Sequence, residues 1–341
     1  MDEKQKKKLI WQLPFLALLI IGTVLIISHQ RSMPYRQVSD FVFGTTYKVI
    51  YQCDSDLSVA ICDELMKVDH SLSPFNKESV ITAVNQNREV TLDPYFVEVF
   101  TKAMDVSADT EGAFDITVAP LVNAWGFGFK NEQMPTAHQV DSLRRIIGYQ
   151  KVSLVDGKIR KQDPRMMLDC SAIAKGFGVD AVARMLRSRG VQNFMVEIGG
   201  EVVTSGINAQ RLPWRVGVVK PTEDSLSTDN ELQTILNVTD KAMATSGNYR
   251  NFYYKNGRRY AHTIDPMTGY PVQHSLLSAT VLADNCTVAD AYATSFMVMG
   301  LKRAKQLLER HPELMAYLIY GDGNGGLAVW FSPSLQDKIE E

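Results

Sequence analysis

The sequence predicts an α+β fold in one catalytic domain, preceded by a single N-terminal apolar helix. Helical and strand patterns alternate irregularly along the chain, which favours α+β over a regular β-α-β arrangement. No repeat, low-complexity tract or linker follows residue 40. With 341 residues, 45% of them hydrophobic and 22% charged, the chain can bury a sizeable core. We therefore expect an N-terminal segment over residues 1–30 and one domain over residues 31–341.

The N-terminal segment has the pattern of a membrane anchor. Lys4 and Lys6–Lys8 precede an uncharged, mostly apolar run from Leu9 to Ile27, which is long enough to cross a bilayer as a helix. A cleavable signal has a shorter apolar region, of about 7 to 15 residues, and ends in small residues, which residues 26–30 do not provide. We expect an uncleaved anchor in the inner (cytoplasmic) membrane. The lysines favour the cytoplasmic side, which places the domain on the outer, periplasmic side.

Three later segments have the apolar spacing of helices. Asp93-Pro94 is a typical helix start, and Gly148 and Gly190 are typical helix ends. The third helix is expected to begin near Val179. The apolar positions are Val97, Phe100 and Met104 in the first segment, Val140, Leu143, Ile146 and Ile147 in the second, and Val179, Val182, Ala183 and Leu186 in the third.

Strand patterns lie between and after these helices. Residues 151–161 alternate around Asp156-Gly157, a dipeptide that favours a tight hairpin turn. Further strands are expected to begin at Phe194 and to cover Trp214–Val219 and Met315–Tyr320, which are rich in β-branched and aromatic residues.

Charge and cysteine content exclude two classes of function. The net charge is −2 and the body of the chain has no long stripe of Lys and Arg, so nucleic acid is not expected as a partner. Four cysteines, Cys53, Cys62, Cys170 and Cys286, show no CxxC spacing and no histidine pairing, so we expect no structural zinc site.

The segment from Asp290 to Thr294 carries the first candidate site. It lies in a helical pattern, and residues four apart share a helix face, so the carboxylate and the hydroxyl can point at one spot. Two hard oxygen ligands suit Mg²⁺, which completes its shell with water and substrate phosphates. Asp and Thr at this spacing more often form a surface pair or a local hydrogen bond.

A second candidate runs from Asp169 to Gly176, before the helix expected near Val179. An acid, small residues and a lysine at a helix entrance can bring backbone groups and a cation close to a phosphate. The alternative is a solvated capping loop, with Asp169 as the cap and Lys175 outside. No GxGxxG or GxxxxGK[ST] pattern occurs, so neither a Rossmann site nor a P-loop is supported.

Short clusters of Gly, acids and hydroxyl residues occur elsewhere and suit turns. They are Gly112–Asp115, Gly199–Glu201 and Thr245–Gly247. His262 precedes an expected turn from Asp265 to Gly269, where a histidine can serve as a base, although most histidines only form hydrogen bonds or lie exposed.

In this order, the segments resemble the ApbE-type FAD:protein FMN transferases. The resemblance implies an ApbE-like, T-fold-related domain and covers nearly everything except the N-terminal run and the stretch after Gly300. The matching blocks are Phe43–Tyr47, Ser73–Asn76, Gly112–Thr117, Trp125–Gly128, Asp169–Gly176, Gly199–Glu201, Trp214–Gly217, Ala244–Gly247, His262–Gly269 and Asp290–Thr294.

The resemblance also implies roles for individual residues. Mg²⁺ would bind Asp290, Thr294 and the main-chain oxygens of Ala172 and Ala293. FAD would contact Phe43, Phe75, Ala113, Phe114, Asp115, Asp169, Lys175 and Ile264, and His262 would be the proton acceptor. The chain departs from the family at Phe43, where Met is common, and at Asn248, where an acid often follows Thr-Ser-Gly.

The implied activity is Mg²⁺-dependent transfer of FMN from FAD to a Thr or Ser hydroxyl of an acceptor flavoprotein in a membrane redox complex. A phosphoester bond forms and AMP is released. Two alternatives are an FAD pyrophosphatase that yields FMN and AMP, and a non-catalytic exported flavin-binding protein. No cysteine precedes Cys53, so the lipid-linked cysteine used by many family members is not expected. The apolar run would hold the enzyme at the membrane.

Overall fold

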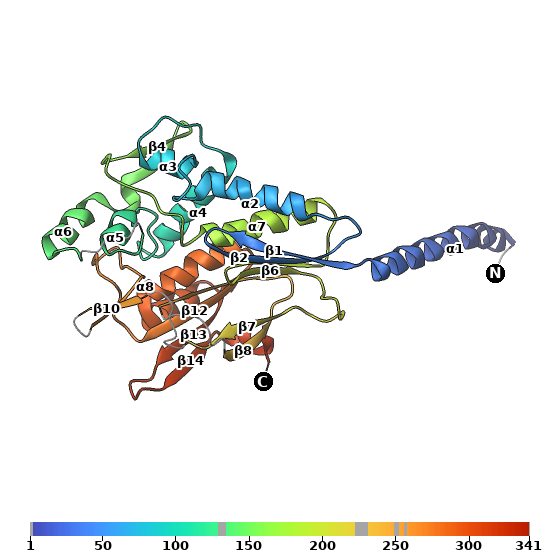
Figure 1. Ribbon diagram of the computed structural model, residues 1–341. Coiled ribbons are helices and arrows are strands. Elements are labelled where there is room, and N and C mark those ends of the chain that lie inside the picture. Colours follow the sequence, from blue (N-terminus) through green and yellow to red (C-terminus); the bar gives the residue numbers. More distant parts are fainter. Residues whose placement is uncertain (1–2, 129–133, 222–230, 249–251, 256–257, 341) are drawn as a thin grey trace.

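The centre of the domain is an eight-stranded antiparallel sheet (Figure 1). The computed structural model describes residues 3–128, 134–221, 231–248, 252–255 and 258–340. In spatial order the strands are β1 (Tyr35–Val42), β2 (Thr45–Gln52), β5 (Phe194–Ile198), β6 (Glu201–Ser205), β9 (Ala242–Gly247), β12 (Leu276–Ala283), β13 (Met315–Gly321) and β14 (Leu327–Phe331).

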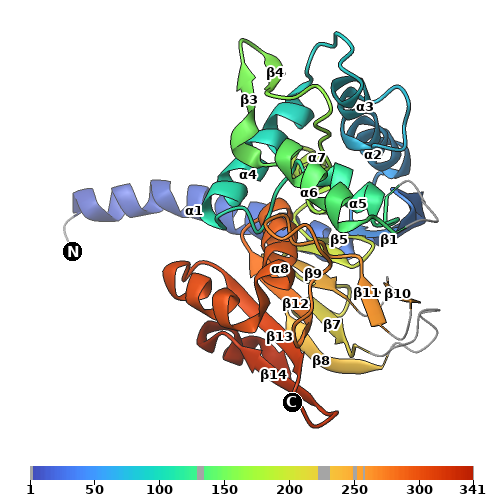
Figure 2. The same ribbon diagram turned by 90° about the vertical axis from the view of Figure 1, so that its left-hand side faces the viewer.

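Helices cover one face of this sheet and a small second sheet covers the other (Figure 2). Successive side chains of a strand point to opposite faces. In β12, Val281 accordingly packs in the main core with the helices, whereas Leu282 faces the small sheet, where Val218 and Leu236 meet it. The helices are α2 (Ser58–Leu72), α4 (Pro94–Asp109), α7 (Ala174–Ser188) and α8 (Cys286–Arg310), and the small sheet comprises β7 (Arg215–Val219), β8 (Leu232–Asn237) and β15 (Ile339–Glu340).

Shorter elements complete the domain. The hairpin predicted for residues 151–161 is confirmed: Asp156 and Gly157 have φ values of 51° and 70° and join its two strands. The elements are α3 (Val80–Asn85), α5 (Ala119–Ala124), α6 (Ala137–Ile146), η1 (Tyr149–Lys151), β3 (Val152–Val155), β4 (Lys158–Lys161), β10 (Phe252–Lys255), β11 (Arg258–Ala261) and η2 (Pro333–Lys338).

Helix α4 begins where the sequence predicts, with Asp93 as its cap. The Asp93 carboxylate accepts a hydrogen bond from the Phe96 amide at 2.9 Å, and Pro94 occupies the first turn. The buried face of α4 is rotated relative to the predicted one. The residues that pack into the core include Phe96, Val99, Phe100 and Ala103. Val97 and Met104 lie at the edges of that face and are only partly buried.

Helix α7 begins at Ala174, five residues before the expected start near Val179. The prediction was wrong because it followed the apolar spacing, which begins at Val179, and Gly176 and Gly178 add no apolar side chain to that pattern. In the structure these glycines allow close packing, since a Cβ at Gly176 would lie 2.3 Å from the Cys286 carbonyl oxygen of α8. Lys175 therefore stands in the first helical turn rather than outside the helix.

Helix α1 (Glu3–Ser32) extends away from the domain (Figure 1). The prediction of a helix here is confirmed. Its large apolar side chains are exposed, for example Leu18 at 72% and Leu25 at 64%. Within the part of the chain that the structure describes, however, no helix combines the length and apolarity needed to cross a membrane. The membrane-spanning role of α1 is therefore not supported by the structure and stays a prediction.

Candidate functional site

One cavity of about 520 Å³ gathers most of the predicted site residues. Its walls come from the first turn of α7, the middle of α8, the β5–β6 turn, the end of β9, and the segments around α5 and after β11. The predicted residues that line it are Phe75, Ala113, Phe114, Asp115, Asp169, Ala172, Lys175, His262, Ile264, Asp290 and Thr294. Segments more than 200 residues apart in the sequence thus meet at one place.

Asp290 and Thr294 lie one helical turn apart on α8, and both line the cavity as predicted. Asp290 Oδ2 accepts a hydrogen bond from the Gly176 amide of α7 at 3.0 Å. The hydroxyls of Thr294 and Ser246 are 3.0 Å apart. Burial raises the pKa of Asp290, and the nearby charge of Lys175 and the Gly176 bond oppose that rise.

Lys175 forms a buried ion pair with Glu201. The distance from Lys175 Nζ to Glu201 Oε1 is 2.5 Å, and Glu201 is 1% exposed. Burial works to raise the pKa of Glu201, and the adjacent Lys175 charge opposes that rise. Burial also works to lower the pKa of Lys175, but the attraction of Glu201 and Asp290 outweighs this, and the net pKa is raised. Glu201 Oε2 is buried and has no hydrogen-bond partner among the described residues.

Asp115 and Asp169 line the cavity, but backbone groups occupy much of their hydrogen-bonding capacity. Asp115 accepts hydrogen bonds from the amide and hydroxyl of Thr117 at 2.8 and 2.6 Å and from the Tyr149 amide at 3.0 Å. Burial raises the pKa of Asp115. Asp169 Oδ1 accepts from the Ser171 amide at 2.7 Å. Asp169 therefore shapes the loop before α7 and is not the cap of that helix, whose N-cap residue is Ile173.

His262 lines the cavity on the segment that follows β11. Its ring lies 6.3 Å from that of Phe127 in an edge-on arrangement. A small hydrophobic cluster, comprising Leu121, Trp125, Val140, Ile147 and Ile264, supports this segment. Trp125 Nε1 also donates a hydrogen bond to the Gly269 carbonyl oxygen at 2.8 Å, which ties α5 to the turn after His262.

Two predicted residues do not line the cavity. The Phe43 ring packs on α7, where a Cβ at Gly178 would lie 2.8 Å from it, and its backbone has a positive φ of 51°. Ala293 is fully buried in the main core. The departure at Asn248 has a structural consequence, because Asn248 Oδ1 accepts a hydrogen bond from the Thr263 hydroxyl at 2.6 Å and so joins the end of β9 to the His262 segment.

The sequence predictions missed Glu201 and Ser246 as site residues, because Gly199–Glu201 and Thr245–Gly247 were interpreted as turns. Gly199 and Gly200 do form a turn, with φ values of 61° and 101°, but this turn places Glu201 at the start of β6, in the cavity wall. The signal available in the sequence was an acid directly after two glycines. Cys170 is 1% exposed, and burial raises the pKa of its thiol, which leaves it unreactive.

The described residues include no group of three or more His, Cys, Asp or Glu side chains that could hold a metal ion. The predicted magnesium ligands are of a different kind, with one carboxylate, one hydroxyl and main-chain oxygens. Asp290, Thr294 and Ala172 all line the cavity. This set of hard oxygens fits a cation such as Mg²⁺, which binds few protein oxygens.

Comparisons with known proteins agree with this arrangement. The model of the ApbE family matches residues 43–319. A curated FAD:protein FMN transferase of Haemophilus influenzae is 36% identical over 87% of this chain and 89% of its own length, and one of Vibrio cholerae is 39% identical over 80% and 84%. The solved structure of the flavin transferase ApbE from Vibrio cholerae superposes with a TM-score of 0.80 at 35% identity, covering 89% of this chain and all of that one.

Proposed function

The chain belongs to the ApbE family, and we propose that it cleaves FAD in the cavity lined by α8 and His262. It is an FAD:protein FMN transferase, an enzyme that moves FMN from FAD to a target protein. The observation that carries the site is the convergence of Asp290, Thr294, Lys175 and His262 on one cavity. The finer features proposed below are the metal, the acceptor hydroxyl, the role of each residue and the cellular location.

The proposed metal is Mg²⁺, held by Asp290, Thr294 and the main-chain oxygen of Ala172. When bound, Mg²⁺ neutralises negative charge on the diphosphate of FAD. Two features of the chain support this choice. Hard oxygens lie on one helical face, and a buried carboxylate lines the cavity, where Lys175 is the one lysine or arginine among the described lining residues. The main-chain oxygen of Ala293, which the resemblance also implies, stays a prediction, since Ala293 is buried in the core and does not line the cavity.

The proposed FAD contacts are the residues that line the cavity around this point. They are Phe75, Ala113, Phe114, Asp115, Asp169, Lys175 and Ile264. Phe75 is 69% exposed and lines the cavity, and we propose that its ring contacts an aromatic ring of the nucleotide. Lys175 supplies a positive point charge for a phosphate oxygen. Phe43 supports α7 from outside the cavity and is not proposed as a contact.

The proposed reaction uses His262 as the proton acceptor. The hydroxyl oxygen of a Thr or Ser side chain of the acceptor protein forms a bond to the phosphorus of the FMN part. The bond from that phosphorus to the bridging oxygen breaks, and AMP leaves with the bridging oxygen. His262 takes the proton of the hydroxyl, and the FMN remains on the acceptor as a phosphoester.

The test compares cells with and without this gene. Proteins that carry covalent flavin in wild-type cells should lack an FMN-sized adduct in the deletion strain, as measured by mass spectrometry of their Ser- and Thr-containing peptides. Adding the purified full chain with FAD and Mg²⁺ to an extract of the deletion strain should restore the adduct, whereas His262→Ala should not. Release of FMN and AMP without any protein adduct would instead identify an FAD pyrophosphatase.

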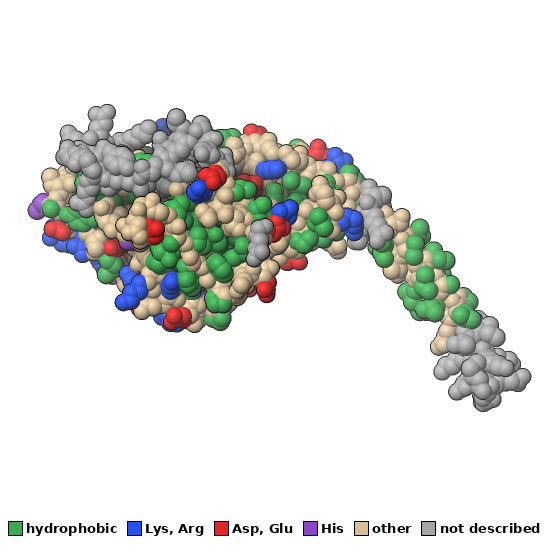
Figure 3. Space-filling view, turned by 90° about the horizontal axis from the view of Figure 1, so that it is seen from below, with side chains coloured by type: hydrophobic (Ala, Val, Ile, Leu, Met, Phe, Trp, Pro, Cys, Tyr) green, Lys and Arg blue, Asp and Glu red, His purple; other side chains and the backbone are tan. Residues whose placement is uncertain are grey.

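We also propose that α1 anchors residues 31–341 at the outer, periplasmic side of the inner membrane, near a flavoprotein of a membrane redox complex. Hydrophobic side chains gather along the described part of this projecting helix, where they have no protein surface to cover (Figure 3). Exposed apolar surface of this kind favours a lipid or protein partner. Removing residues 1–30 should move the chain from the membrane fraction to the soluble fraction. Unchanged fractionation would refute the anchor.

A further inference from the structure

Lys175 lies near two buried carboxylates but forms an ion pair with only one of them. Its ammonium is 2.5 Å from Glu201 Oε1. Asp290 Oδ2 instead accepts a hydrogen bond from the Gly176 amide. Among the described residues there is no ion pair between Lys175 and Asp290. The Lys175 ammonium therefore stays beside Glu201, and the neutral Gly176 amide is the group that donates to Asp290.

This arrangement depends on Glu201, because a lysine is a mobile charge. The Lys175 side chain is 32% exposed and has a flexible stem, whereas the Glu201 side chain is 2% exposed and fixed at the start of β6. Leaving a buried carboxylate or ammonium without its partner is costly. If Glu201 lost its charge, the nearest buried anion left for Lys175 would be Asp290, which also faces this lysine electrostatically.

We infer that Glu201 is a positioning residue, which holds the Lys175 ammonium away from Asp290 and so keeps the Asp290 carboxylate available to a divalent cation. This inference rests on the proposed metal site. The unpaired Oε2 of Glu201 supports it, because a carboxylate that only stabilised the fold would have both buried oxygens satisfied. Glu201 also lines the cavity, where we propose that the substrate and the cation bind.

The experiment measures Mn²⁺ binding to the full chain without FAD, by the loss of the free Mn²⁺ signal in electron paramagnetic resonance. Glu201→Gln should raise the Kd for Mn²⁺ about tenfold or more, the range typical of lost support for a metal ligand. Adding Lys175→Gln to Glu201→Gln should bring the Kd back close to the wild-type value, because the competing ammonium is gone. A merely structural role of Glu201 would not give this recovery.

A shorter acid separates position from charge. Glu201→Asp keeps the negative charge but withdraws it by one methylene, so Lys175 should be held less well and the Kd should rise toward that of Glu201→Gln. A wild-type Kd for Glu201→Asp would show that charge alone matters and would overturn the positioning role. So would a wild-type Kd for Glu201→Gln, or a double variant that binds as weakly as Glu201→Gln.

Asp290→Asn is the control for the metal site itself. It keeps an oxygen for the Gly176 amide but removes the charged ligand. If this variant bound Mn²⁺ as the wild type does, the proposed metal site would fail. If Asp290→Asn lost Mn²⁺ binding while the Glu201 variants kept the wild-type Kd, the metal site would be supported and only the positioning role of Glu201 would be refuted. Circular dichroism of each variant confirms that the fold is retained.

Discussion

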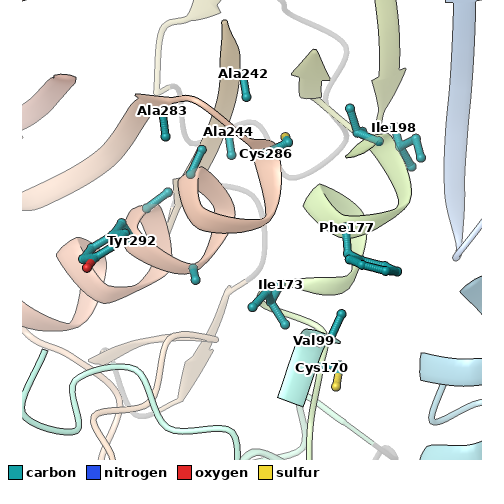
Figure 4. Close-up of a cluster of buried hydrophobic side chains, with 14 of the residues drawn as sticks. Val99, Cys170, Ile173, Phe177, Ile198, Ala242, Ala244, Ala283, Cys286 and Tyr292 are labelled. Atoms are coloured by element: carbon teal, nitrogen blue, oxygen red, sulfur yellow. The ribbon is translucent and has the colours of Figure 1, made fainter. Parts of the chain in front are cut away.

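Two parts of the cavity lining are supported in different ways. They are the α8 wall, which carries Asp290 and Glu201, and the His262 wall, the segment around His262. Asp290 and Glu201 stand on α8 and β6, within the main core, and Figure 4 shows Cys286 of α8 and Phe177 of α7 among its buried side chains. His262 stands on a segment supported by the small cluster around Trp125. The first wall is a set of buried charges, and the second carries one histidine, the proposed base, on a segment held by hydrophobic and aromatic packing.

This difference predicts which property of the enzyme each wall should control. Residues on helices and strands of a packed core hold a charge in place with little freedom. A segment held by few buried side chains can shift without unfolding of the domain. Changes in the α8 wall should therefore affect cation binding, and changes in the His262 wall should affect turnover while cation binding stays the same.

The largest expected effect is in the α8 wall. Asp290→Ala should lower FMN transfer about 1000-fold or more, since a metal ion contributes several kcal/mol and each ~1.4 kcal/mol corresponds to tenfold. The domain should remain folded, because Lys175 keeps its partner Glu201. Initial rates with saturating FAD and Mg²⁺, together with the thermal melting curve, provide the measurement. Full activity would remove Asp290 from the site.

The second effect is at His262. His262→Ala should lower kcat by about 10² to 10⁴ and leave the affinity for FAD nearly unchanged, because a base acts mainly in the transition state. His138→Ala, at an exposed position on α6, is the matched control and should behave as the wild type. A loss confined to FAD affinity would assign His262 to binding instead of proton transfer.

A smaller effect tests the support of His262. Trp125→Phe keeps an aromatic ring but removes the hydrogen bond to the Gly269 carbonyl oxygen. We expect a loss of about 1 to 2 kcal/mol of stability and about a tenfold lower kcat, with the Kd for Mn²⁺ unchanged. Trp330→Phe, whose ring packs under Lys305 away from this cluster, is the control. A raised Kd for Mn²⁺ in Trp125→Phe would show that the two walls are coupled.

The smallest effect lies at the far end of α8. Burial works to lower the pKa of His311, but hydrogen bonds to Glu313 and Asp109 outweigh it and raise the pKa. The Tyr292 hydroxyl donates a hydrogen bond to Asp109, and the charge of Arg310 acts on Tyr292. A raised histidine pKa adds stability that is fully present below the unfolded value and is lost as pH rises through the folded pKa.

His311→Gln should therefore cost about 0.5 to 1 kcal/mol near pH 5.5 and less near pH 8.5, as measured by urea unfolding at both pH values. Transfer activity at neutral pH should be unchanged, because this group does not line the cavity. A larger loss of stability near pH 8.5 than near pH 5.5 would contradict the assigned direction.

Local chemistry explains what the sequence could predict. The α4 cap at Asp93, the hairpin turn at Asp156-Gly157 and the helical pair Asp290 and Thr294 depend on neighbouring residues, and each is confirmed. The start of α7 was missed because Gly176 serves contact with α8, a residue far away in the sequence. The place of Glu201 in the site was missed for the same reason, since its partner Lys175 is distant in sequence.

The most direct test of the site is a crystal of the full chain with FAD and Mn²⁺, examined by anomalous scattering. The proposed function predicts a manganese peak between Asp290 and Thr294, next to the diphosphate of FAD, with His262 across the cavity on the side from which an acceptor hydroxyl would attack. A manganese peak away from both α8 residues, or a diphosphate that faces neither α8 nor His262, would contradict it.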